Sequence, residues 1–160
     1  MDGLSDLEAL ARLGIAMGVG AGLGLEREIL RKSAGIRTLM LVCEGAALFM
    51  ICSILLAEQV IEAGGIADPT RIASTVVQGI GFLAGGLIFT ARERVRGLTT
   101  AAEIWVAAAL GLLIGAGFLV VALGAAGATL VALVVLRTLQ IKLPFGRKGS
   151  ETEVGDIDDV

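Results

Sequence analysis

The sequence contains no histidine and no tyrosine, and it has only one tryptophan and two prolines. Without histidine, the chain has no imidazole metal ligand, no histidine general base and no side chain that ordinarily titrates near neutral pH. Charged residues make up 18% of the chain, whereas an ordinary soluble domain has about 25%. These shortages argue against a soluble enzyme, and we expect no enzymatic activity and no nucleic-acid partner.

Cysteine is also scarce. The two cysteines, Cys43 and Cys52, lie nine residues apart within one apolar run. At about 100° per residue, this separation places them on opposite faces of a helix. We therefore expect no disulfide and no shared metal ion between them, and we interpret both as small buried apolar side chains.

Long apolar segments take the place of the missing polar residues. Hydrophobic residues make up 56% of the chain, and 23 residues are glycine. The uncharged run 104–136 would be about 50 Å long as one helix, against a hydrocarbon core of about 30 Å, so we divide it near Gly111, Gly115 and Gly117. The predicted fold is an all-α membrane protein, a bundle of five transmembrane helices. We place these helices at residues 7–25, 36–56, 72–89, 98–114 and 118–139.

The distribution of basic residues predicts the orientation. Eleven of the 13 lysines and arginines lie between the first and second spans, between the third and fourth, or after the fifth. With five spans all three regions fall on one side, which the positive-inside rule makes cytoplasmic. We therefore predict the N-terminus outside and the C-terminus inside.

The last residues differ in composition from the rest. Residues 1–143 form the predicted transmembrane helical domain. In residues 144–160, Pro144, Gly146 and Gly149 interrupt the helix, and five acids follow among the last eleven residues. We predict a solvated, disordered cytoplasmic tail; the alternative is a tail that binds a cation or docks a partner.

Glycines recur every four residues in several spans, which makes a flat strip on a helix. Gly14, Gly18 and Gly22 do so in the first span, and Gly81 and Gly85 in the third. We predict that these five pack helices together within the bundle, with a homodimer interface as the alternative. Two further strips, Gly20 with Gly24 and Gly111 with Gly115, have the same spacing.

Two carboxylates, Glu44 and Glu103, lie inside hydrophobic segments. A charge there costs about 2.5–3.5 kcal/mol on insertion scales, so such residues usually face protein or water. Both are near the cytoplasmic ends of their spans, within reach of an arginine such as Arg37 or Arg96. One interpretation is that arginine partners neutralise them and pin helices together. The other is a polar cavity open to the cytoplasm that binds a cation or a basic side chain of a partner.

Several ordered blocks resemble the MgtC/SapB family across residues 10–139. They are 24–28 (GLERE), 32–42 (KSAGIRTLMLV), 45–49 (GAALF), 78–86 (QGIGFLAGG) and 95–105 (VRGLTTAAEIW). The resemblance covers the membrane domain, whereas full-length relatives carry a cytoplasmic domain after the last span.

The resemblance implies a multi-pass protein of the bacterial inner membrane, linked to growth in low magnesium, ion homeostasis and virulence. It implies a non-enzymatic regulator that restrains the proton-translocating ATP synthase; the alternative is a small transporter or channel for magnesium or another cation. The expected partners are the lipid bilayer, another membrane protein such as ATP synthase, and a second copy of the chain. We expect no resident cofactor, with Mg²⁺ as the open alternative.

Carried over to this sequence, the family's polar signature lies at the predicted cytoplasmic surface. It comprises Glu26, Arg27, Arg37, Thr38, Arg96, Thr99 and Thr100. Together with Glu44 and Glu103 these residues form the predicted binding cluster. The competing interpretation makes Glu26 and Arg27 a charge pair at a helix end and Thr99 a helix N-cap.

Overall fold

The computed structural model describes residues 4–91 and 94–142, with side chains for 4–88 and 97–139. In this part of the chain, five helices and a short two-stranded hairpin follow one another. They are α1 (Asp6–Ile29), α2 (Ile36–Glu62), α3 (Thr70–Gly86), β1 (Phe89–Ala91), β2 (Arg94–Arg96), α4 (Leu98–Gly115) and α5 (Leu119–Lys142). The predicted five-helix bundle is confirmed. The predicted acidic tail, residues 144–160, lies outside the described residues.

The hairpin was not expected from the sequence. Its strands are antiparallel, with Phe89 opposite Arg96, and the first strand begins at Phe89, the last residue of the segment predicted as the third span. That helix therefore ends at Gly86 and has 17 residues. Four helices, α1, α2, α4 and α5, are long and apolar enough to cross a membrane.

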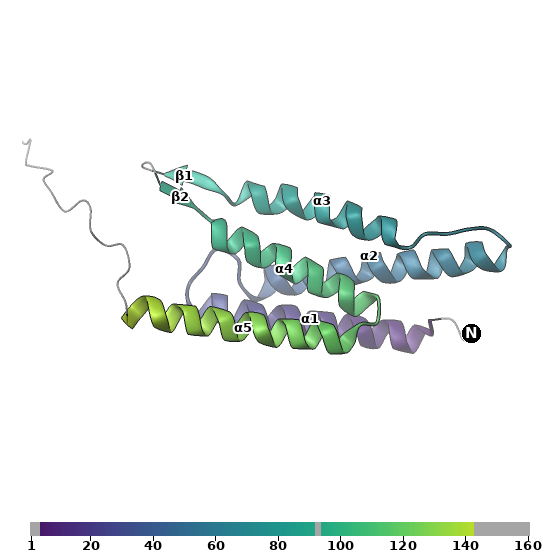
Figure 1. Cartoon of the computed structure of the whole chain (residues 1–160), viewed down its shortest axis with the longest axis horizontal. Helices are drawn as coiled ribbons and strands as arrows, with labels where there is room; N and C mark the ends of the chain where they lie inside the picture. Colours follow the sequence, from purple (N-terminus) through teal and green to yellow (C-terminus); the bar gives the residue numbers. More distant parts are fainter. Residues whose placement is uncertain (1–3, 92–93, 143–160) are drawn as a thin grey trace, which may run out of the picture.

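Consecutive helices run in opposite directions (Figure 1). The α1–α2 loop, the hairpin and the far end of α5 consequently meet at one end of the bundle, opposite the N-terminus. We call this the basic end, because the described lysines and arginines of the three basic regions belong to it. Their common location is what the five-span orientation requires.

Local chemistry explains where the helices turn. The segment predicted to break near three glycines breaks only at Gly117, which has φ +89°. The Gly117 and Phe118 N–H groups donate to the Ile114 and Leu113 carbonyls, the hydrogen-bond pattern of a Schellman helix end. Gly111 and Gly115 remain within α4.

The start of α3 depends on Asp68. Its carboxylate accepts hydrogen bonds from the Thr70 N–H at 3.0 Å and the Thr70 hydroxyl at 2.6 Å. These bonds favour the ionised form, and they lower the pKa of Asp68 below its usual value. The helix therefore begins with a side chain that satisfies one of its free N–H groups.

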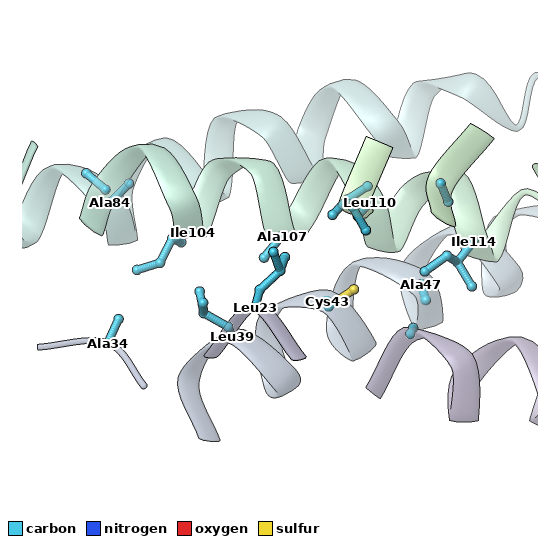
Figure 2. Packing of buried hydrophobic residues seen from close by; sticks show 14 residues of the cluster. Leu23, Ala34, Leu39, Cys43, Ala47, Ala84, Ile104, Ala107, Leu110 and Ile114 are labelled. Carbon is cyan, nitrogen blue, oxygen red and sulfur yellow. The ribbon is translucent and has the colours of Figure 1, made fainter. Parts of the chain in front are cut away.

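The core lies between α1, α2 and α4 and is made of small and aliphatic side chains (Figure 2). Leu39, Cys43 and Ile114 are fully buried there. Glycines allow the close approach of the helices: a Cβ on Gly20 would lie 2.5 Å from the Leu39 carbonyl oxygen, and one on Gly115 would lie 2.7 Å from that of Ala47. The close packing predicted for small residues in membrane helices is therefore made by these positions.

The five glycines singled out for packing do not make these contacts. Gly14, Gly18, Gly22, Gly81 and Gly85 are exposed, and a Cβ on any of them would meet no atom of the described chain within 4 Å. Their assignment to contacts within the bundle is therefore wrong. In α1 the helix is rotated so that the Gly20–Gly24 strip faces α2 instead, and in α3 the buried residue is Ala84. The homodimer alternative stays a prediction.

The two cysteines differ in their surroundings. Cys43 is buried between the helices, as expected, whereas Cys52 is exposed. The expectation of two buried cysteines is therefore wrong for Cys52, because the half-turn offset that separates the two also turns one of them outward.

Orientation can be tested by cysteine labelling in a background with both native cysteines replaced. A cysteine at Ser33, exposed in the α1–α2 loop, should stay unlabelled by a membrane-impermeant maleimide in intact cells. One at Ala63, exposed at the opposite end, should be labelled. After the membrane is opened, both should react. Labelling of the Ser33 position in intact cells would reverse the predicted orientation.

Candidate functional site

The centre of the site is a buried ion pair between two helices. Arg27, in the last turn of α1, places its Nη1 2.7 Å from Oε1 of Glu103 on α4. The side chains of Arg27 and Glu103 are 3% and 9% exposed. A buried charge requires such a partner, because removing one partner leaves the other uncompensated.

Arg27 also connects three separate segments. Its Nη2 donates to the Thr100 hydroxyl on α4, and its Nε donates to the Ala34 carbonyl in the α1–α2 loop at 3.5 Å. The fork of donors on a guanidinium suits several acceptors at once. Arg27 therefore fixes the positions of α1, α4 and the loop relative to one another.

A cavity of about 910 Å³ opens beside this pair at the basic end; we call it the basic pocket. Residues from α1, the α1–α2 loop, α4 and α5 line it. The basic lining residues are Arg27, Arg31, Lys32 and Arg137, and the acidic ones are Glu26 and Glu103. Ser33, Thr99 and Thr100 add hydroxyl groups, and four leucines add apolar surface: Leu30, Leu98, Leu133 and Leu136. The pocket is thus a net positive site with an apolar wall.

Arg31 has an unusual backbone conformation. It is the one non-glycine with positive φ in the described chain, at 52°. Its N–H donates to the Glu28 carbonyl and that of Lys32 donates to the Arg27 carbonyl, so Arg31 occupies the left-handed position of a Schellman motif. The equivalent positions after α2 and α4 are Gly64 and Gly117.

The structure brings five of the predicted site residues together. Glu26, Arg27, Thr99, Thr100 and Glu103 all line the basic pocket, from helices far apart in sequence. Arg27 pairs with Glu103 and not with Glu26. The N-cap of α4 is Gly97, so Thr99 lies inside the helix and the N-cap interpretation of it is wrong.

Other predicted residues lie elsewhere. Arg37 and Thr38 are exposed in the first turn of α2 and do not line the pocket. Glu44 is half-buried on α2, and no arginine or lysine among the described side chains forms an ion pair with it. Arg96 lies on β2, and its side chain is outside the described part.

Three residues of the basic pocket were not predicted as site residues from the sequence. Arg31, Lys32 and Arg137 were counted among the basic residues of the cytoplasmic side, yet they line the same cavity. Their location at the ends of the first and fifth spans was the signal that could have found them. The leucines on α5 carry no such signal, because every face of that helix is apolar.

The residues that line the pocket suit anions and hydrogen-bond donors better than metal ions. Among residues 4–91 and 94–142, no group of three or more acidic or cysteine side chains is arranged to hold a metal ion. Mg²⁺ prefers six oxygen ligands, which Glu26 and Glu103 alone do not supply. Glu103 Oε2 is buried without a hydrogen-bond partner among the described atoms, so it can accept a hydrogen bond from a ligand.

Comparison with known proteins identifies the family. The model of the MgtC family matches residues 13–141, which include α2, α3 and α4 in full, most of α1 and α5, and the residues of the basic pocket. The chain belongs to the MgtC family. The resemblance seen in the sequence blocks is therefore confirmed.

Proteins similar to this chain occur in several bacteria. A putative magnesium transporter of Escherichia coli, YhiD, is 39% identical over 85% of this chain and 64% of its own length. An uncharacterized protein of Synechocystis is 44% identical over 82% of this chain and 53% of its own. Protein MgtC of Brucella abortus is 45% identical over 63% and 40%.

The chain spans about half to two thirds of the length of the first two of these relatives. None of the three names is that of an enzyme. No solved structure matches the chain.

Proposed function

We propose that this MgtC-family protein is a non-enzymatic regulator in the bacterial inner membrane. It acts on a membrane protein that handles ions, of which the proton-translocating ATP synthase is our leading candidate. Its role is exercised under magnesium limitation and contributes to ion homeostasis and, in pathogens, to virulence. The basic end, with the Arg27–Glu103 pair at its centre, is the surface that carries the effect.

The observation that supports a regulator is the segregation of polar groups at the two ends of the helical core. Toward the opposite end from Arg27 and Glu103, the residues between α1, α2 and α4 are apolar and tightly packed: Ala16, Gly20, Cys43, Ala47, Ala107, Leu110 and Ile114. A transported ion requires polar groups along its path, since an unpaired charge in this environment is costly. The described core of one copy offers no such path.

An arginine also joins the helices at the opposite end of the core. Arg12 on α1 donates from Nη1 to the Gly115 carbonyl at 2.7 Å and pairs with Glu8 at 2.5 Å. This arginine ties the start of α1 to the end of α4, as Arg27 ties the two helices at the basic end. A bundle fastened at both ends suits a protein that presents a surface better than one that alternates between two openings.

A flux measurement tests the proposal. The purified chain in sealed vesicles loaded with a magnesium-sensitive or pH-sensitive dye should give no Mg²⁺ or proton flux above that of empty vesicles. A known channel reconstituted in parallel confirms that the vesicles report flux. The contrary result is flux above that of empty vesicles that the double variant Arg27→Met with Glu103→Leu abolishes. It would show that the protein is a cation transporter or channel, the alternative to a regulator.

A further inference from the structure

We propose that the basic pocket binds the phosphate group of an anionic phospholipid from the cytoplasmic leaflet. The proposal assigns a ligand to the proposed functional site and rests on its predicted cytoplasmic orientation. The pocket lies between the last turn of α1, the first turn of α4 and the C-terminal part of α5.

Unpaired positive charge is the first requirement for a phosphate site. Arg27 is neutralised by Glu103, but Arg31, Lys32 and Arg137 form no ion pair with any described carboxylate. All three are exposed at the mouth of the pocket. Basic pockets between helices on the cytoplasmic side are suited to the head groups of anionic lipids.

The first turn of α4 adds backbone donors. Its N-cap is Gly97, which has no side chain to accept hydrogen bonds from the helix, and no acid lies in the first turn. Free N–H groups and the positive end of the helix dipole make such a terminus favourable for a phosphate. Gly97, Leu98, Thr99 and Thr100 all line the pocket.

The left-handed backbone conformation of Arg31 indicates that its side chain contacts a ligand. A non-glycine residue in the left-handed region costs about 1–2 kcal/mol, and two other helix ends avoid this cost with Gly64 and Gly117. Arg31 also lines the pocket, so its guanidinium can reach a ligand there. A functional contact of that guanidinium accounts for the strained choice of residue.

The apolar wall identifies a lipid rather than a free phosphate. Leu133 and Leu136 of α5 line the pocket, next to Arg137. Among the described side chains of α5, which end at residue 139, only Ala122 and Ala126 are buried, both in its first third. The C-terminal part of α5 thus keeps exposed apolar side chains beside the pocket, and an acyl chain that extends from the bound head group into the bilayer can contact them.

Lipid binding to the delipidated protein in dodecyl maltoside tests the proposal, with thermal stabilisation and native mass spectrometry as readouts. Phosphatidylglycerol should bind more tightly than phosphatidylcholine. Arg31→Gly and Arg137→Gln should each weaken phosphatidylglycerol binding about fivefold, the effect expected for one basic residue near an anionic lipid surface. Arg71→Gln is the matched control, because Arg71 is 88% exposed and belongs to the first turn of α3, which begins away from the basic end. Phosphatidylglycerol binding to this variant should be unchanged.

Arg31→Gly separates a ligand contact from a structural role. It removes the backbone strain, so the unliganded protein should be as stable as the parent or more stable, while lipid binding falls. Equal binding of the two lipids, or unchanged phosphatidylglycerol affinity in both variants, would overturn the proposal. Inorganic phosphate that stabilises the protein as much as phosphatidylglycerol does would overturn the lipid as the source. These outcomes do not depend on ion flux, so they are distinguishable from a failure of the regulator proposal.

Discussion

Arg27→Met alone is expected to lower the free energy of unfolding by about 3–5 kcal/mol, the usual cost of breaking a buried ion pair. The variant keeps most of the side-chain volume but leaves Glu103 buried without its cation. The Thr100 hydroxyl and the Ala34 carbonyl also lose their donor. Glu103→Leu alone is expected to be destabilising in the same way, because it leaves the Arg27 guanidinium buried without its carboxylate.

The double variant Arg27→Met with Glu103→Leu is expected to recover most of this loss. Replacing both members of a buried pair by apolar residues removes the desolvation penalty of each, and is often neutral or stabilising. A double variant no more stable than the single ones would show that the pair is not the dominant interaction at this position.

Trp105 provides the measurement. It is the single tryptophan, lies on α4 two residues after Glu103 and is 49% exposed, so its fluorescence reports unfolding of α4 in detergent. The same variants should be compared for growth at low magnesium. If the double variant is stable but inactive, the ion pair serves function directly; if activity returns with stability, its role is structural.

Gly20→Ala is expected to destabilise the bundle by about 2–3 kcal/mol, near the upper part of the range for overpacked cores. The added methyl group would lie 2.5 Å from the Leu39 carbonyl oxygen and 2.7 Å from the Met40 Cα. Both are backbone atoms, so α1 and α2 must move apart.

Gly22→Ala is the matched control, two residues further along α1. Its methyl group would meet no described atom within 4 Å, and alanine favours the helix by up to about 1 kcal/mol over glycine. This variant should therefore be neutral or more stable in the same unfolding measurement. Equal destabilisation by both substitutions would mean that the close α1–α2 contact is not where the structure places it.

Gly20 and Gly22 also show what the sequence alone does not determine, which is the face of α1 that packs against the bundle. Two strips with the same four-residue spacing run along α1, one through Gly18 and Gly22 and one through Gly20 and Gly24. Two residues correspond to about 200° of rotation, so the strips lie on opposite faces. Because apolar residues flank both, nothing local indicates which face is inside, and only the packing of all the helices decides it.

For the Arg27–Glu103 ion pair, the sequence predicted that Glu103 has a basic partner but not which arginine it is. The cost of burying Glu103 required a partner, and the charge distribution placed that partner at the basic end. The expected arginines were Arg37 and Arg96, whereas the observed partner is Arg27, 76 residues away in sequence. Orientation follows from counting charges, but the choice among neighbouring arginines depends on helix rotation, which an almost uniformly apolar helix such as α4 does not reveal.

The short third helix has a consequence for the surrounding lipid. With 17 residues, α3 is about 26 Å long, whereas α2, with 27, is about 40 Å long. Its outward side chains include Phe82 and Leu83, which are 84% and 56% exposed. The hydrocarbon core of an ordinary bilayer is thicker than α3 is long, whereas α2 is longer than that core is thick. The leaflets beside α3 must therefore thin. We therefore expect the protein to deform the surrounding bilayer asymmetrically, with the thinnest membrane beside α3.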